Sequence, residues 1–118
     1  MTEYVNPGSE KKTPAYGIAH LHDVQLGDGI VEYLRGIDAT LQPFGGRFVI
    51  HGGVPTVLEG DWTGDLIVIE FPDRENALAW YRSEAYQKIL PLRLANSTGT
   101  AVIIDGVDAD HVATDVLG

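Results

Sequence analysis

The sequence contains no cysteine, and its eight lysines and arginines are outnumbered by seventeen aspartates and glutamates. Without cysteine, disulfide bonds and thiolate chemistry are excluded, and a cytoplasmic location is the default expectation. The net charge of −9 repels nucleic-acid backbones and anionic lipids, so we expect neither nucleic acid nor a membrane as a partner. No apolar run approaches the about 20 residues that a membrane-spanning helix needs. No complete catalytic signature is present, so the sequence predicts architecture better than it predicts a reaction.

The chain has 118 residues, 44% of them hydrophobic, which is enough for one compact domain and too short for two. Residues 1–14 have almost no apolar content and are predicted to form a flexible N-terminal arm. Residues 15–106 are predicted to form the domain. Residues 107–118, which include Asp108 and Asp110, are predicted to form an acidic C-terminal tail.

The spacing of apolar residues predicts strands over 15–21, 66–71 and 98–105, and extended segments over 47–51 and 54–59. A helix over 28–41, with Asp28 as N-cap, follows the first strand. Between the last two strands we predict a helix capped by Asp73 and a further helix that begins at Ser83 and is limited by Pro91. Gly52 and Gly53 join the two extended segments, and we expect a bulge there in one long strand, with a tight turn as the alternative. This order is the βαββαβ pattern of ferredoxin-like α+β domains. Such domains have an antiparallel sheet with helices on one face.

The strand over 66–71 is apolar on both of its faces. Ile67 and Ile69 alternate with Leu66 and Val68, so both sheet faces would carry apolar side chains at this strand. Helices on one face cannot cover both. We therefore predict that a second copy of the chain covers the other face, in a symmetric homodimer.

Several short motifs occur together between about Tyr16 and Gly106: Gly45-Gly46-Arg47, Gly52-Gly53, Leu58-Glu59-Gly60-Asp61-Trp62, Ile69-Glu70-Phe71-Pro72, Trp80-Tyr81, Ser83, Tyr86 and Arg93. In these motifs the chain resembles the bacterial domain-of-unknown-function family numbered 1330. The resemblance implies the dimeric α/β-barrel superfamily, which also holds cofactor-free oxygenases, muconolactone isomerases and haem enzymes. It implies a fold and a dimer but no activity. His51 stands where the family more often has arginine, so this chain has a group there that titrates near neutral pH.

Polar residues within the strands suggest a catalytic site. Strand alternation places Arg47 and His51 on one face of their strand, and it places Glu70 on the same face as Leu66 and Val68. If these faces coincide beneath the helices, Arg47 would orient a carboxylate or enolate and His51 or Glu70 would transfer a proton. The alternative is a structural ion pair between Arg47 and Glu70, because alternation does not fix the register between strands.

Further residues could complete a ligand site. Trp80 and Tyr81 could line an aromatic pocket or simply pack in the core. Arg93, in an apolar context, is expected to reach solvent or to pair with Glu59 or Glu70. The predicted substrate-binding residues are His20, His22, Trp62, Tyr81, Tyr86 and Arg93.

His20 and His22 have the spacing of two metal ligands on one side of a strand, and His51 with Glu59 or Glu70 could complete a site. No third ligand lies nearby in the sequence, so we predict no metal site. The expected function is therefore that of a cofactor-independent enzyme, oxygenase-like or isomerase-like, acting on a small organic acid or ketone. The alternative is a non-catalytic module that binds a small molecule or serves as a dimer scaffold.

Overall fold

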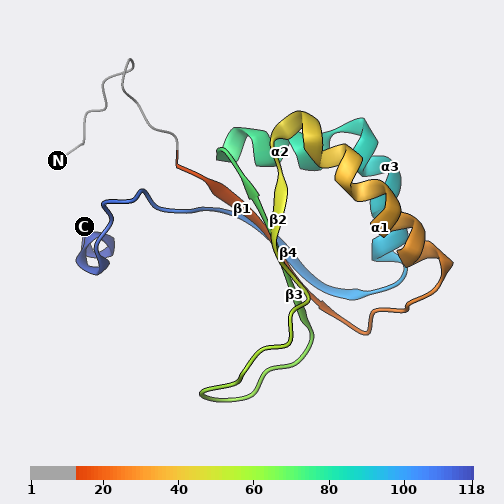
Figure 1. The fold of residues 1–118 in the computed structure, drawn as a ribbon, viewed down its shortest axis with the longest axis horizontal. Coiled ribbons are helices and arrows are strands. Elements are labelled where there is room, and N and C mark those ends of the chain that lie inside the picture. Colours follow the sequence, from red (N-terminus) through yellow and green to blue (C-terminus); the bar gives the residue numbers. More distant parts are fainter. Residues whose placement is uncertain (1–12) are drawn as a thin grey trace.

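The computed structural model describes residues 13–118 as a four-stranded antiparallel sheet with three α-helices on one face (Figure 1). The sheet order is β2-β3-β1-β4. The elements are β1 (Ala15–His22), α1 (Asp28–Leu41), η1 (Gln42–Phe44), β2 (Arg47–His51), β3 (Asp65–Phe71), α2 (Arg74–Arg82), α3 (Glu84–Leu94), β4 (Thr98–Asp105) and η2 (Ala113–Leu117). The ferredoxin-like α+β prediction is confirmed. The predicted N-terminal arm lies, except for its last two residues, outside the described part of the chain.

The helix ends follow local capping chemistry. The Asp73 side chain accepts a hydrogen bond from the Asn76 N–H at 2.8 Å, and Ser83 Oγ accepts one from the Tyr86 N–H at 3.2 Å, as predicted. Asp28 was expected to cap α1, but Gly27 is the N-cap, because its carbonyl accepts the first helical bond, from Val31. Pro91 does not end α3, since its carbonyl still accepts from the Ala95 N–H at 2.9 Å.

The segment between β2 and β3 differs from the prediction. Residues 54–59 form no strand, and residues 52–64 make a long loop that projects beyond the sheet (Figure 1). Gly52 adopts φ 73°, a left-handed conformation that turns the chain out of β2. The bulge lies earlier, between Phe48 and Ile50, instead of at the glycine pair.

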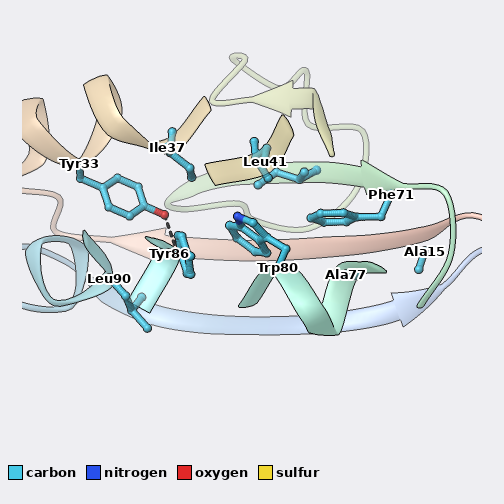
Figure 2. Packing of buried hydrophobic residues seen from close by; sticks show 10 residues of the cluster. Ala15, Tyr33, Ile37, Leu41, Phe71, Ala77, Trp80, Tyr86 and Leu90 are labelled. Carbon is cyan, nitrogen blue, oxygen red and sulfur yellow. Dashed lines mark hydrogen bonds between the residues drawn. The ribbon is translucent and has the colours of Figure 1, made fainter. Parts of the chain in front are cut away.

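The hydrophobic core lies between the sheet and the helices (Figure 2). Phe71 of β3 and Tyr86 of α3 are its largest fully buried side chains. Gly46 makes room for this packing: a Cβ atom there would lie 2.7 Å from Phe71 Cε1 and 2.8 Å from Leu41 Cδ2. A larger residue would push β2 away from the core.

The other face of the sheet, here called the open face, has no helix. Strand register places on it Tyr16, Ile18, His20, Leu66, Val68, Glu70, Val102 and Ile104. Val102 and Ile104 are 48% and 52% exposed, although both are apolar.

No helix in the described part of the chain is long and apolar enough to cross a membrane.

Candidate functional site

The structure places Arg47 and His51 on opposite faces of the sheet. Arg47 pairs with Glu70 and His51 pairs with Ile67, and these partners lie three residues apart on β3. Because alternate residues of a strand point to opposite faces, the two side chains diverge. The bulge between Phe48 and Ile50 reverses the alternation within β2. The prediction of one shared face is therefore wrong, since strict alternation assumes an unbroken strand.

Arg47 and Glu70 bind each other on the open face. Arg47 Nε and Nη2 lie 3.0 Å and 2.8 Å from Glu70 Oε1, and the Tyr16 hydroxyl donates to Glu70 Oε2 at 3.1 Å. The hydrogen bond to Glu70 is the main reason that the pKa of Tyr16 is raised. The Arg47 side chain is 68% exposed, so this is a solvated ion pair. The geometry matches the structural ion pair, and the catalytic roles of both residues stay a prediction.

His20, His22 and Trp62 form a second group, apart from the helices. The His20 ring stacks on Trp62 with centroids 4.7 Å apart, and it lies 4.5 Å from the His22 ring. His20 Nε2 donates to the Thr63 carbonyl at 2.7 Å, because a carbonyl can only accept. These contacts hold the end of the 52–64 loop against β1. Within residues 13–118, no three histidine or acidic side chains are grouped as metal ligands would be.

A cavity of about 620 Å³ lies between the sheet and the helices. This volume falls within the range of about 300–1,000 Å³ that is usual for small-molecule sites. Its walls are mostly apolar and aromatic. The polar and aromatic residues of the lining include Tyr33, His51, Trp80, Tyr81, Tyr86 and Arg93.

One end of this cavity holds a buried cation beside two hydroxyl groups. Tyr86 and Arg93 lie seven residues apart on one side of α3, and the Tyr33 hydroxyl of α1 lies 2.7 Å from that of Tyr86 (Figure 2). Arg93 is only 9% exposed. Among residues 13–118, no carboxylate forms an ion pair with it. The expectation that Arg93 reaches solvent or pairs with Glu59 or Glu70 is therefore wrong.

The two tyrosines and Arg93 influence each other's protonation. Burial, followed by interactions with Tyr86, raises the pKa of Tyr33 far above its usual value of 10.0. Burial lowers the pKa of Arg93, but its Coulombic and hydrogen-bonding interactions with Tyr86 and Tyr33 outweigh burial and leave that pKa raised. At neutral pH, this end of the cavity therefore holds one positive charge and a neutral hydroxyl donor in Tyr33.

His51 of β2 and Trp80 of α2 both line the cavity. The His51 ring lies on the helix side of the sheet, parallel to Phe48 with centroids 4.3 Å apart and planes at 7°. Trp80 packs in the core and also lines the cavity. Its indole N–H donates to Thr40 Oγ1 at 2.9 Å, which fixes the ring. The predicted residues His51, Tyr81, Tyr86 and Arg93 thus line one cavity, whereas Arg47, Glu70, His20, His22 and Trp62 do not.

Tyr33 is a cavity residue that was not predicted from the sequence. Its spacing in α1, between Ile30 and Ile37, places it among the buried residues of that helix, and this spacing is the sequence feature that could have identified it. A hydroxyl on such a stripe needs a buried partner, and Tyr86 provides it.

The family model described as "Domain of unknown function (DUF1330)" matches residues 14–107. This chain belongs to that family. No curated protein matches it in sequence. The DUF1330 domain is similar in fold to the RPA0582 protein of Rhodopseudomonas palustris, a protein of unknown function, with a TM-score of 0.63, 16% identity, and 86% of this chain and 88% of that chain covered. A methylated form of RPA0582 aligns with a TM-score of 0.63 and 13% identity, and 89% of each chain is covered.

A further solved structure is that of SnoaB, a cofactor-independent oxygenase from Streptomyces nogalater. It aligns with a TM-score of 0.48 and 13% identity, over 86% of this chain and 98% of its own. A similarity of that size carries no argument about the activity of the DUF1330 domain. The matches to RPA0582 support the fold alone.

Proposed function

We propose that this DUF1330 domain binds a small, partly apolar organic acid or ketone in the cavity between its sheet and helices, and acts on it without a cofactor. The cavity of about 620 Å³ is the observation that carries the proposal. A well-packed domain of this size has no structural need for so large a space. Apolar walls with a few polar groups are typical of sites that bind small organic molecules.

His51 is the candidate for proton transfer. It lines the cavity, and an imidazole has one ring nitrogen that can accept a proton and one that can donate it, as general acid–base catalysis needs. Removal of a proton next to a carbonyl group, followed by its return at another carbon, is an isomerisation that needs no further reactant. An oxygenase-like reaction would use dioxygen as co-substrate. The ion pair of Arg47 and Glu70 favours the alternative of a non-catalytic binding module, because it leaves His51 without those two partners.

We also propose that two copies of the domain associate through the open face. The support is the exposure of Val102 and Ile104 on a sheet face without helices. Light scattering should then give a dimer mass. Val102→Lys should shift it towards the monomer, whereas Val31→Lys, on the outer surface of α1, should not. A monomeric wild type would contradict this proposal.

The predicted cytoplasmic location stays a prediction.

Hydrogen exchange on bound ligands tests the proposed chemistry without knowledge of the product. Small carboxylic acids and ketones that raise the melting temperature would be incubated with the protein in D₂O, and loss of the proton next to the carbonyl group followed by NMR. The wild type should accelerate this loss, and His51→Asn should slow it about 100-fold while binding is retained. His111→Asn, in the C-terminal segment, is the matched control. Binding without any acceleration in the wild type would favour the non-catalytic alternative.

A further inference from the structure

We infer that Arg93 and the hydroxyls of Tyr33 and Tyr86 form a carboxylate-binding site inside the cavity, and that the ligand is the monoanion of an organic acid with an apolar, ring-sized body. This inference rests on the proposed function, because it places the ligand in the same cavity. It narrows the choice between an acid and a ketone to the acid.

Arg93 carries a buried positive charge. A guanidinium group stays protonated, and removing it from water is costly unless a counter-charge lies nearby. Arg93 is 9% exposed, its side chain interacts with the hydroxyls of Tyr33 and Tyr86, and among residues 13–118 no carboxylate forms an ion pair with it. It lies in the last turn of α3, where the helix dipole contributes the equivalent of about half a negative charge, which is too little to neutralise it. A carboxylate on the ligand would supply the missing charge.

Arg93 and the two tyrosines also supply several hydrogen-bond donors. A guanidinium presents a planar set of N–H groups that matches a carboxylate in two parallel bonds. In the bond between Tyr33 and Tyr86, one hydroxyl donates and the other accepts, so the accepting hydroxyl still has a proton to give. Donors converge here, and a carboxylate is a pure acceptor. An amide or a ketone of the same shape could use fewer of them.

The remaining walls indicate the rest of the ligand. The rings of Trp80 and Tyr86 lie 4.0 Å apart between centroids, and Tyr81 lies 5.6 Å from Tyr86. Together they provide an aromatic surface beside Arg93, which suits a flat apolar body. Arg74, a second arginine at the cavity, already lies 3.7 Å from Asp105, so of these two arginines Arg93 is the one left for a ligand carboxylate, and Asp65 adds a negative charge to the lining. The site therefore fits a monoanion better than a dianion.

Matched acid and amide probes test this inference on the full chain. Benzoate with benzamide, and 2-naphthoate with 2-naphthamide, would be titrated while backbone NMR signals are followed. Each acid should bind at least about tenfold more tightly than its amide, because only the acid neutralises Arg93. Phthalate, a dianion, should bind more weakly than benzoate. Arg93→Met should abolish the preference for acids without loss of amide binding, and Tyr86→Phe should reduce it several-fold. Arg74→Met, which alters an exposed arginine at the same cavity, should leave it unchanged.

The possible results separate this inference from the proposed function. If acid and amide bind equally and shift signals of cavity residues, the carboxylate site is overturned and the proposed function stands. If no probe shifts cavity residues, both are overturned. If Arg93→Met does not fold, Arg93→Lys takes its place: it keeps the charge without the planar set of donors, so a reduced preference supports the inference. An unchanged preference in both Arg93→Lys and Tyr86→Phe overturns it.

Discussion

The hydroxyl oxygens of Tyr33 and Tyr86 lie 2.7 Å apart, in a hydrogen bond that joins α1 to α3 above the sheet (Figure 2). Both side chains are buried, so the bond is made away from water. It fixes the two helices relative to each other at the end of the cavity that holds Arg93. The stability of the domain and the proposed ligand site therefore depend on the same two residues.

Tyr33→Phe should lower the free energy of unfolding by about 0.5–1.5 kcal/mol and should also change its pH dependence. The pKa of Tyr33 is raised in the folded state, so its stabilising effect is complete below pH 10.0, the usual tyrosine value, and is lost as the pH rises towards the folded-state pKa. Urea unfolding between about pH 9 and pH 11 should therefore show a smaller loss of stability in the variant than in the wild type. Equal losses would show that Tyr33 is not shielded from ionisation.

Thr40→Val should destabilise the domain by about 1–3 kcal/mol, because it leaves the buried Trp80 indole N–H without an acceptor. The substitution keeps the shape of the side chain, so little packing is lost. Thr98→Val is the control: its hydroxyl is exposed and makes only a 3.4 Å bond to the His22 carbonyl. Chemical unfolding of both variants measures the difference. Similar midpoints would mean that the bond to Trp80 contributes nothing.

At protein concentrations where light scattering shows a monomer, Arg47→Ala should lower the free energy of unfolding by less than about 1 kcal/mol, because the ion pair with Glu70 is exposed to water in the single domain. The same substitution should leave binding of acids unchanged, since Arg47 lies on the open face. Arg74→Ala, which loses a 3.7 Å contact with Asp105, provides an exposed ion pair for comparison. A loss of about 3–5 kcal/mol in the monomer would contradict an exposed pair, whereas such a loss only at concentrations that give a dimer would indicate a pair buried in the proposed assembly.

Gly46→Ala should destabilise the domain by about 1–3 kcal/mol, because the added methyl group would meet Phe71 and Leu41 at less than van der Waals distance. Gly53→Ala is the matched control, since a Cβ atom there meets nothing within 4 Å. Thermal unfolding distinguishes the two. A Gly46→Ala variant as stable as Gly53→Ala would mean that β2 shifts without cost.

The elements could be predicted because their signals are local. Apolar spacing gave α1 its range, and Asp73 and Ser83 marked two helix starts, since capping depends on residues within one turn. The loop over 54–59 could not be predicted in this way. Its valines suit a strand, but no neighbouring strand pairs with them in the described chain.

The site was predicted only in part, because its residues meet through tertiary contacts. The bulge at Phe48 and Ile50 leaves no clear mark in the sequence, and it alone separates His51 from Arg47. Arg93 was noted for its apolar context, yet its partners come from α1 and from one helical face of α3. Only the packing of α1 on α3 brings Tyr33 to them.

The most direct test of the account is to locate bound benzoate on the uniformly labelled protein by NMR. We predict that the largest shifts and the contacts between ligand and protein involve Arg93, Tyr86 and His51, on the helix side of the sheet. Contacts confined to Arg47, His20 or Trp62 on the open face, with the cavity signals unchanged, would contradict it.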